Sequence, residues 1–141
     1  GAATVLMASG EDLPGNVKAV IADCGYTSEW DEFQREADAL HIPWFPVLNA
    51  TSVLSKIRDG YDFKQASALA QVKKSRIPTL FIHGSSDELV PYSMLGELYA
   101  AAACEKEELT VEGAGHALSS SVAPTLYWRT VEDFIAKYLD R

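Results

Sequence analysis

Three short runs of apolar, mostly β-branched residues stand out along the chain, and turn-forming residues follow each of them. The first run covers Val17–Asp23 and ends at Cys24-Gly25; the second covers Thr79–His83 and ends at a Gly-Ser-Ser-Asp turn. The third covers Leu109–Glu112 and ends at a Gly-Ala-Gly-His turn. The first two are almost continuously hydrophobic, which is typical of parallel strands covered on both faces. The pattern therefore predicts three strands of a parallel sheet.

Segments with helical periodicity lie before, between and after these runs. Gly1–Ser9 is apolar on every side, which predicts a helix buried in a larger body. Ser93 is expected to cap a helix over Met94–Ala103, and Pro124 suits the first turn of a last helix. The stretch between the second and third runs is long enough for a helical crossover between parallel strands. Together these elements predict an α/β fold.

A longer excursion, at about residues 26–76, separates the first two strands. Its pattern predicts an acidic helix over Glu29–Leu40 and further helical pieces around Leu48–Arg58 and Lys64–Lys73. An excursion of this size over an α/β sheet often shapes a binding cleft. Four aromatic residues either line such a pocket or pack the excursion onto the sheet: Tyr26, Trp30, Trp44 and Phe45.

Composition narrows the possible classes of protein. The chain has 141 residues, of which 48% are hydrophobic, so one domain with a sizeable core is expected. Its net charge of −8 argues against nucleic acid or an anionic membrane as a partner, and Lys73–Arg76 is expected to be a solvated face. No apolar run approaches the roughly 20 residues that span a bilayer. Cys24 and Cys104 form neither a disulfide framework nor a metal-binding spacing, and a cytoplasmic location is expected.

Two chemically capable residues follow successive strands. Asp87 lies in the turn after the second strand and His116 in the turn after the third. Because the carboxyl ends of parallel strands meet at one edge of a sheet, this carboxylate can orient this imidazole as a general base. Taken alone, an Asp in this place is more often a turn cap, and a lone His in a glycine-rich turn is more often structural. The pair, in this order, indicates catalysis.

The context of both residues is similar to that in the α/β-hydrolase-fold serine hydrolases. His83–Pro91 (HGSSDELVP) resembles the HGxxDxxVP segment after the seventh strand of that fold, and Gly113–His116 (GAGH) resembles the G-x-G-H turn after the eighth. Residues 22–28 and 73–78 resemble an esterase- or peptidase-like bacterial branch of the family. The resemblance covers essentially the whole chain. It implies that Asp87 is the triad acid and His116 the triad base, with no metal or organic cofactor.

The nucleophile of this family is a serine in a G-x-S-x-G motif, and that motif does not occur in the sequence. Gly1–Met7 instead resembles the last glycine of the motif and the helix that follows it. The resemblance therefore implies that residues 1–141 are the carboxyl-terminal part of one α/β-hydrolase domain whose amino-terminal half, with the serine, is absent. Such a piece is expected to be inactive alone and to self-associate or pair with the missing half, because Val17–Asp23 would present an unpaired strand edge.

Internal residues are poor substitutes for that serine. Cys24 ends a strand, but it lacks glycines on both sides and any feature that would lower its pKa, so we expect a buried structural thiol. The serines near the two turns lack the strand–nucleophile–helix setting that exposes an activated hydroxyl. They are Ser85, Ser86, Ser119, Ser120 and Ser121.

Three further side chains offer alternatives for the acid and the base. Asp23 is the rival acid, since some α/β hydrolases take their acid from the preceding strand, although its context matches the motif less fully than that of Asp87. His83 is expected to bond to the backbone at a strand end, and His41 to be a loop histidine.

The sequence thus predicts part of a serine hydrolase that acts on carboxylic esters, thioesters or amides, with a small-molecule ester or a peptide as substrate of the intact protein. The alternative is a non-catalytic α/β module of hydrolase ancestry that works through binding or assembly. That alternative would explain the absence of a nucleophile without requiring that the amino-terminal half of the domain is missing.

Overall fold

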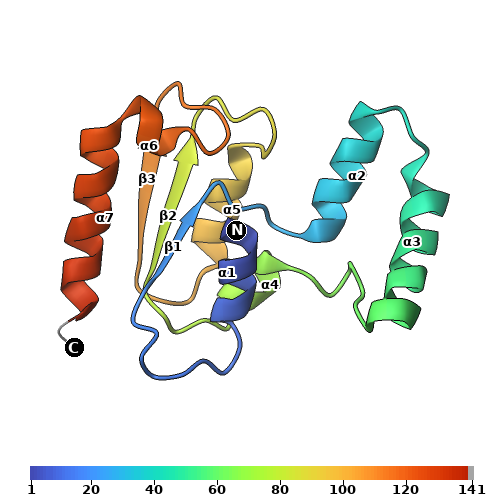
Figure 1. Ribbon diagram of the computed structural model, residues 1–141, viewed down its shortest axis with the longest axis horizontal. Helices are drawn as coiled ribbons and strands as arrows, with labels where there is room; N and C mark the ends of the chain where they lie inside the picture. The colour runs from blue at the N-terminus through green and yellow to red at the C-terminus, as the bar shows by residue number, and fades with distance from the viewer. Residues whose placement is uncertain (140–141) are drawn as a thin grey trace.

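Three parallel strands form the centre of the structure, a computed structural model that describes residues 1–139 (Figure 1). They are β1 (Val20–Asp23), β2 (Thr79–Gly84) and β3 (Lys106–Val111), side by side in the order β1-β2-β3. The predicted strands are confirmed, with two shifts of boundary. Residues before Val20 form a turn closed by the Val17 N–H on the Pro14 carbonyl, which shortens β1. The third strand begins earlier than predicted, because its first residues are charged and carry no hydrophobic signal.

Helices cover both faces of this sheet (Figure 1). On one face, α1 (Ala2–Ser9), α4 (Ala68–Val72) and α5 (Ser93–Ala101) enclose Phe81 of β2. On the other, α6 (Ser119–Val122) leads into α7 (Pro124–Leu139), which packs on Leu80 and Ile82 of the same strand. Alternate residues of β2 thus enter opposite cores, which explains its unbroken hydrophobic run. Within residues 1–139, no helix combines the length and the apolar character that a membrane crossing requires.

One expectation about an individual helix is wrong, and another stays a prediction. Helix α1 buries Ala3, Leu6 and Ser9 while Val5 is 40% exposed, so the described residues cover it on one face only, and its burial in a larger body stays a prediction. Ser93 does not cap α5; it is the first helical residue, and no side chain caps this helix. The Met94 N–H already donates to the Pro91 carbonyl oxygen, so a helix-like backbone turn begins before Ser93.

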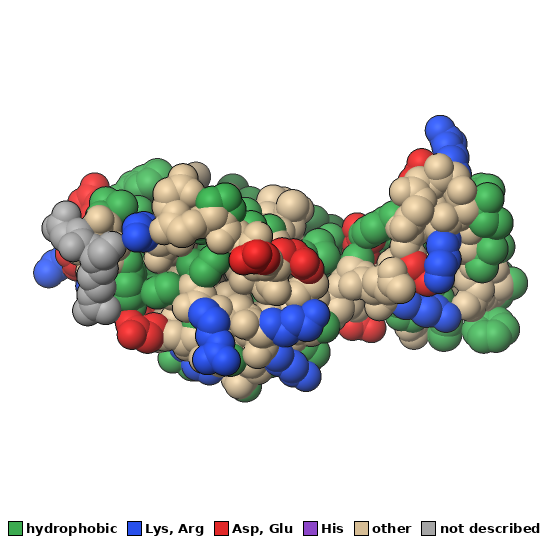
Figure 2. Space-filling model, turned by 90° about the horizontal axis from the view of Figure 1, so that it is seen from below, with side chains coloured by type: hydrophobic (Ala, Val, Ile, Leu, Met, Phe, Trp, Pro, Cys, Tyr) green, Lys and Arg blue, Asp and Glu red, His purple; other side chains and the backbone are tan. Residues whose placement is uncertain are grey.

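The excursion forms a helical hairpin that stands away from the sheet, and Figure 2 shows its narrow connection to the body. It consists of α2 (Glu29–Ala39), capped by the Ser28 side chain, and α3 (Trp44–Asp59), which begins earlier than predicted because prolines suit a first helical turn. These helices pack on each other, so the interpretation that the excursion's aromatic residues pack onto the sheet is wrong for Trp30, Trp44 and Phe45, which lie in the hairpin. Of the predicted Lys64–Lys73 helix, only α4 is helical.

The turns after β2 and β3 are fastened to each other at Gly84. A Cβ atom there would lie 2.2 Å from the carbonyl oxygen of Ala114 and 2.7 Å from its carbonyl carbon. The Ser86 N–H donates to that same oxygen at 3.0 Å, and the Ser85 N–H donates to the Val111 carbonyl at 3.0 Å. Only a residue without a side chain allows the two turns to approach this closely.

Replacing Gly84 by Ala should therefore lower the free energy of unfolding by about 1–3 kcal/mol or more, since the new methyl group meets backbone atoms that cannot move aside easily. Gly96→Ala is the matched control, because a Cβ on Gly96 in α5 meets nothing; there we expect a gain of roughly 0.5–1 kcal/mol. Urea unfolding of the three proteins measures both effects. Equal midpoints for Gly84→Ala and the unaltered protein would contradict the close approach.

Candidate active site

Asp87 occupies the turn after β2 at the carboxyl edge of the sheet. Its Oδ1 accepts the backbone N–H groups of Leu89 at 2.9 Å and Val90 at 2.8 Å, so the carboxylate closes its own turn. The side chain has no exposed surface. Its second oxygen is thereby held in one direction, toward the turn that follows β3.

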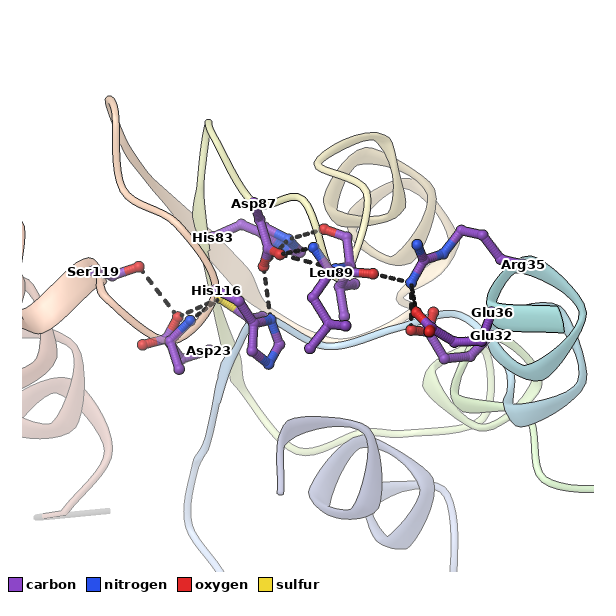
Figure 3. A network of polar contacts seen from close by, with 12 residues as sticks. Asp23, Glu32, Arg35, Glu36, His83, Asp87, Leu89, His116 and Ser119 are labelled. Atoms are coloured by element: carbon purple, nitrogen blue, oxygen red, sulfur yellow. Dashed lines mark hydrogen bonds and ion pairs between the residues drawn. The ribbon is translucent and has the colours of Figure 1, made fainter. Parts of the chain in front are cut away.

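His116 meets that second oxygen (Figure 3). Its Nδ1 lies 2.9 Å from Asp87 Oδ2, and the side chain is 36% exposed. Because an ionised carboxylate can only accept hydrogen bonds, Nδ1 carries the proton and Nε2 keeps its lone pair. A partly exposed imidazole held in this tautomer is equipped to accept a proton from a hydroxyl group. The structure thus brings together the two residues singled out in the sequence.

His83 adds another donor to the same carboxylate. Its ring is buried, and its Nε2 lies 3.1 Å from the Val90 carbonyl oxygen and 3.2 Å from Asp87 Oδ2. One N–H is therefore shared between two acceptors. The expectation that His83 bonds to the backbone is confirmed, and the contact with Asp87 comes in addition.

Hydrogen bonds to the Asp87 carboxylate decide whether it is ionised. Burial by itself raises the pKa of a carboxyl group, because it disfavours the charged form. Hydrogen bonds from the Val90 N–H and from His116 outweigh burial, so the pKa of Asp87 lies below its ordinary value. At neutral pH the residue is a carboxylate, the form that stabilises an imidazolium beside it.

Asp23 and Cys24, at the end of β1, lie near Asp87 and His116 but form different hydrogen bonds. The Cys24 thiol donates to Asp23 Oδ1 at 3.2 Å, and the Ser119 hydroxyl donates to the same oxygen at 3.3 Å (Figure 3). Burial, followed by the contact with Asp23, raises the pKa of Cys24 to about 12. Asp23 is thus engaged by Cys24 and Ser119, whereas the His116 ring is bonded to Asp87. This geometry favours Asp87 over Asp23 as the acid.

The Cys24 thiol lies close to both Asp87 and His116, whereas the sequence indicated only a buried structural thiol. Potential ligand atoms of Cys24, Asp87 and His116 all lie within 4.8 Å of one another, and these are residue types that hold zinc. A metal would have to displace a thiol proton whose pKa is about 12 and break the hydrogen bond between Asp87 and His116. The arrangement suits proton transfer better than metal binding.

The hairpin also touches the acid turn. Arg35 on α2 donates to the carbonyl oxygen of Leu89, and its guanidinium is paired with Glu32 at 2.5 Å (Figure 3). Nothing in the charge pattern of α2 indicated this contact. Between the hairpin helices lies an open hollow of about 440 Å³, lined by three of the four aromatic residues noted in the sequence and by Lys64. Those three are Trp30, Trp44 and Phe45.

The remaining candidates have other tasks or lie elsewhere. The Ser85 hydroxyl accepts the Gly113 N–H at 2.8 Å, which helps to join the two turns. His41 is exposed between the hairpin helices with a φ of 57°, as expected for a loop histidine. Neither stands beside the His116 imidazole in the way a nucleophile would.

Comparison with known proteins now identifies the family. The sequence model of the prolyl oligopeptidase family, Peptidase_S9, matches residues 1–141. This chain belongs to the prolyl oligopeptidase family. The predicted resemblance to esterase- and peptidase-like hydrolases is thereby confirmed, and the chain is a member of a hydrolase family.

Curated relatives are considerably longer than this chain. The protein YqkD of Bacillus subtilis is 29% identical over 136 residues, which make up 96% of this chain and 45% of YqkD. The protein Rv2307c of Mycobacterium tuberculosis is 32% identical over 81 residues, 57% of this chain and 25% of that protein. The chain spans less than half the length of these relatives.

Solved structures show the same fold. The Pyrococcus furiosus esterase PF2001 has a TM-score of 0.68 at 16% identity, over 99% of this chain and 51% of the esterase. The esterase domain of a Rhodothermus marinus protein has a TM-score of 0.68 at 20% identity, over 99% and 57%. An acylaminoacyl peptidase bound to Z-Gly-Gly-Phe-chloromethyl ketone has a TM-score of 0.68 at 16% identity, over 98% and 22%. The predicted α/β-hydrolase fold class is confirmed.

The hydrogen bonds to Asp87 predict a pH-dependent effect of Asp87→Asn. A carboxylate whose pKa is lower in the folded state contributes stability that is complete above its unfolded pKa of about 3.9 and is lost as the pH falls through the folded value. The variant should therefore be about 1–3 kcal/mol less stable at pH 7, and this difference should shrink below about pH 4. Glu88→Gln, an exposed neighbour, is the control. Denaturant unfolding between pH 7 and pH 3 measures the difference, and a penalty that grows toward acid pH would contradict the account.

Proposed function

We propose that this chain supplies the general base, His116, and the orienting acid, Asp87, of a serine hydrolase. The observation that carries the proposal is the 2.9 Å hydrogen bond from Nδ1 of a partly exposed imidazole to a fully buried carboxylate. It stands at the carboxyl edge of a parallel sheet, the place where open α/β sheets bind their ligands. Membership of a hydrolase family supports it independently.

In this proposal the two residues divide the work of proton transfer. His116 Nε2 takes the proton of a serine hydroxyl as the serine attacks the substrate carbonyl, and Nε2 then returns that proton to the leaving group. Asp87 holds the imidazole in the required tautomer and stabilises the imidazolium that forms between these steps. Backbone N–H groups stabilise the tetrahedral oxyanion, and water then cleaves the acyl-enzyme.

The nucleophile is proposed to lie outside these 141 residues. Support comes from the sequence, in which Gly1–Met7 resembles the last glycine of the nucleophile motif and the helix after it. The substrate is proposed to be a small-molecule ester, thioester or peptide, because the structural neighbours include esterases and an acylaminoacyl peptidase. No step of this chemistry requires a metal or an organic cofactor.

The unpaired edge of the sheet at β1 supports the proposal that another polypeptide packs against it. Strand β1 pairs with β2, and no further described strand lies beyond it. An apolar hollow of about 250 Å³ lies next to this edge, with Val5, Val17 and Ile21 among its lining residues. Unpaired strand edges and exposed apolar surface both favour association. We propose that a second copy, or the other half of a longer protein, covers this edge.

Ester hydrolysis by the protein in its longest natural form tests the assignment of the acid and the base. Both His116→Ala and Asp87→Asn should lower kcat by roughly a thousandfold or more, because loss of a triad member removes proton transfer while binding remains. Asp23→Asn should have a much smaller effect, since this carboxylate bonds to Cys24 and Ser119.

An activated ester such as a p-nitrophenyl ester gives the rates, and unfolding curves ensure that variants of equal stability are compared. Near-normal turnover in His116→Ala would contradict the proposed base. A larger loss in Asp23→Asn than in Asp87→Asn would reverse the assignment of the acid. Absence of hydrolysis in the unaltered protein would favour a binding module of hydrolase ancestry.

A further inference from the structure

Two residues with left-handed backbone conformations face each other beside the site. Cys24, directly after β1, has a φ of 60°, and Ala117, directly after His116, has a φ of 55°. Side chains with a Cβ atom disfavour this region, and such residues persist where surrounding contacts hold them in place. Both positions are next to residues of the site rather than in distant loops. The contacts of Cys24 and Ala117 can therefore affect where the His116 imidazole lies.

One contact joins the two residues. The Ala117 N–H donates to the Cys24 sulfur atom at 3.3 Å. At its own backbone, Cys24 is fixed to the sheet, because its N–H donates to the Ile82 carbonyl oxygen at 2.9 Å. The sulfur atom thus links the end of β1 to the residue that follows His116. The turn that carries the imidazole is attached to β1 at this point.

The thiol is at the same time a hydrogen-bond donor. With a pKa of about 12 it is protonated at neutral pH, and it donates to Asp23 Oδ1 at 3.2 Å. The sulfur atom also lies within 4.8 Å of a carboxylate oxygen of Asp87 and of a ring nitrogen of His116. A protonated, buried thiol is a weak nucleophile, so Cys24 does not suit covalent catalysis. Its contacts instead reach the His116 turn and the carboxylates on both sides of it.

We propose that Cys24 is a positioning residue: its thiol holds the His116 turn against the end of β1 and so keeps the imidazole in register with Asp87. The contact itself is a property of the fold, whereas its consequence for turnover rests on the proposed function. Serine in this place would keep a donor and an acceptor but reach less far, because a C–O bond is shorter than a C–S bond. Alanine or glycine would remove the link.

The test uses Cys24→Ala, Cys24→Ser and Cys24→Gly in the protein in its longest natural form. Glycine tolerates the left-handed backbone, so Cys24→Gly removes the thiol without the strain that a Cβ carries there. Cys104→Ala is the matched control, because Cys104 lies at the opposite end of the sheet, 3.7 Å from the Thr79 hydroxyl. Unfolding curves recorded alongside separate a loss of stability from a loss of positioning.

The first readout is the nuclear magnetic resonance signal of the His116 Nδ1 proton in protein with nitrogen-15-labelled histidine. A proton held in a hydrogen bond to a buried carboxylate exchanges slowly and gives a separate low-field signal, which we expect in the unaltered protein and in Cys104→Ala. The signal should broaden or vanish in Cys24→Ala and Cys24→Gly and return in part in Cys24→Ser. An unchanged signal in both Cys24→Ala and Cys24→Gly would overturn the proposal.

The second readout is ester hydrolysis. We expect kcat to fall about tenfold to a hundredfold in Cys24→Ala and Cys24→Gly with KM nearly unchanged, because a small displacement of a catalytic group slows the chemical step more than it weakens binding. Cys24→Ser should recover part of that loss. Equal kcat in all variants, with hydrolysis present, would overturn the proposal. If the unaltered protein hydrolyses no ester, the proposed function fails, and the proton signal alone decides whether the thiol positions His116.

Discussion

The close approach of the turns after β2 and β3 is the constraint on which the site depends. Parallel pairing brings both strand ends to one edge of the sheet, but pairing alone leaves room for the turns to diverge. Gly84 removes that freedom, because its lack of a side chain lets the Ala114 carbonyl come near enough to accept the Ser86 N–H. Asp87 ends one turn and His116 ends the other. Their hydrogen bond is therefore a consequence of backbone packing before it is a matter of side-chain chemistry.

Asp87 shows how one carboxylate fulfils a structural and a chemical requirement together. One oxygen closes the turn by accepting two backbone N–H groups, and the other accepts from His116 and lies within reach of His83. Hydrogen bonds from the Val90 N–H and from His116 lower the pKa that burial would otherwise raise, so the residue stays ionised without exposure to solvent. The turn-cap interpretation and the catalytic interpretation of this residue are thus compatible, since each uses a different oxygen atom.

The sequence was sufficient to predict the three strands, the parallel sheet and the meeting of Asp87 with His116, because hydrophobic runs and the two turn motifs are local signals. It did not show that Ala117 bonds to Cys24 or that Arg35 bonds to Leu89, since each contact joins residues far apart in the chain. The β3 boundary was missed because Lys106 and its neighbours are polar on a half-buried strand. The hairpin's separation from the sheet was missed because hydrophobic spacing predicts a helix but not the surface that it packs on.

Covalent labelling tests the central claim, that His116 activates a serine outside these residues, most directly. A fluorophosphonate reacts with an activated serine hydroxyl, and mass spectrometry of the labelled protein identifies the modified residue. In the protein in its longest natural form, the account predicts one labelled serine outside residues 1–141 and loss of labelling in His116→Ala. A label within the chain, on Cys24 or on a serine such as Ser119, or labelling that His116→Ala leaves unchanged, would contradict it.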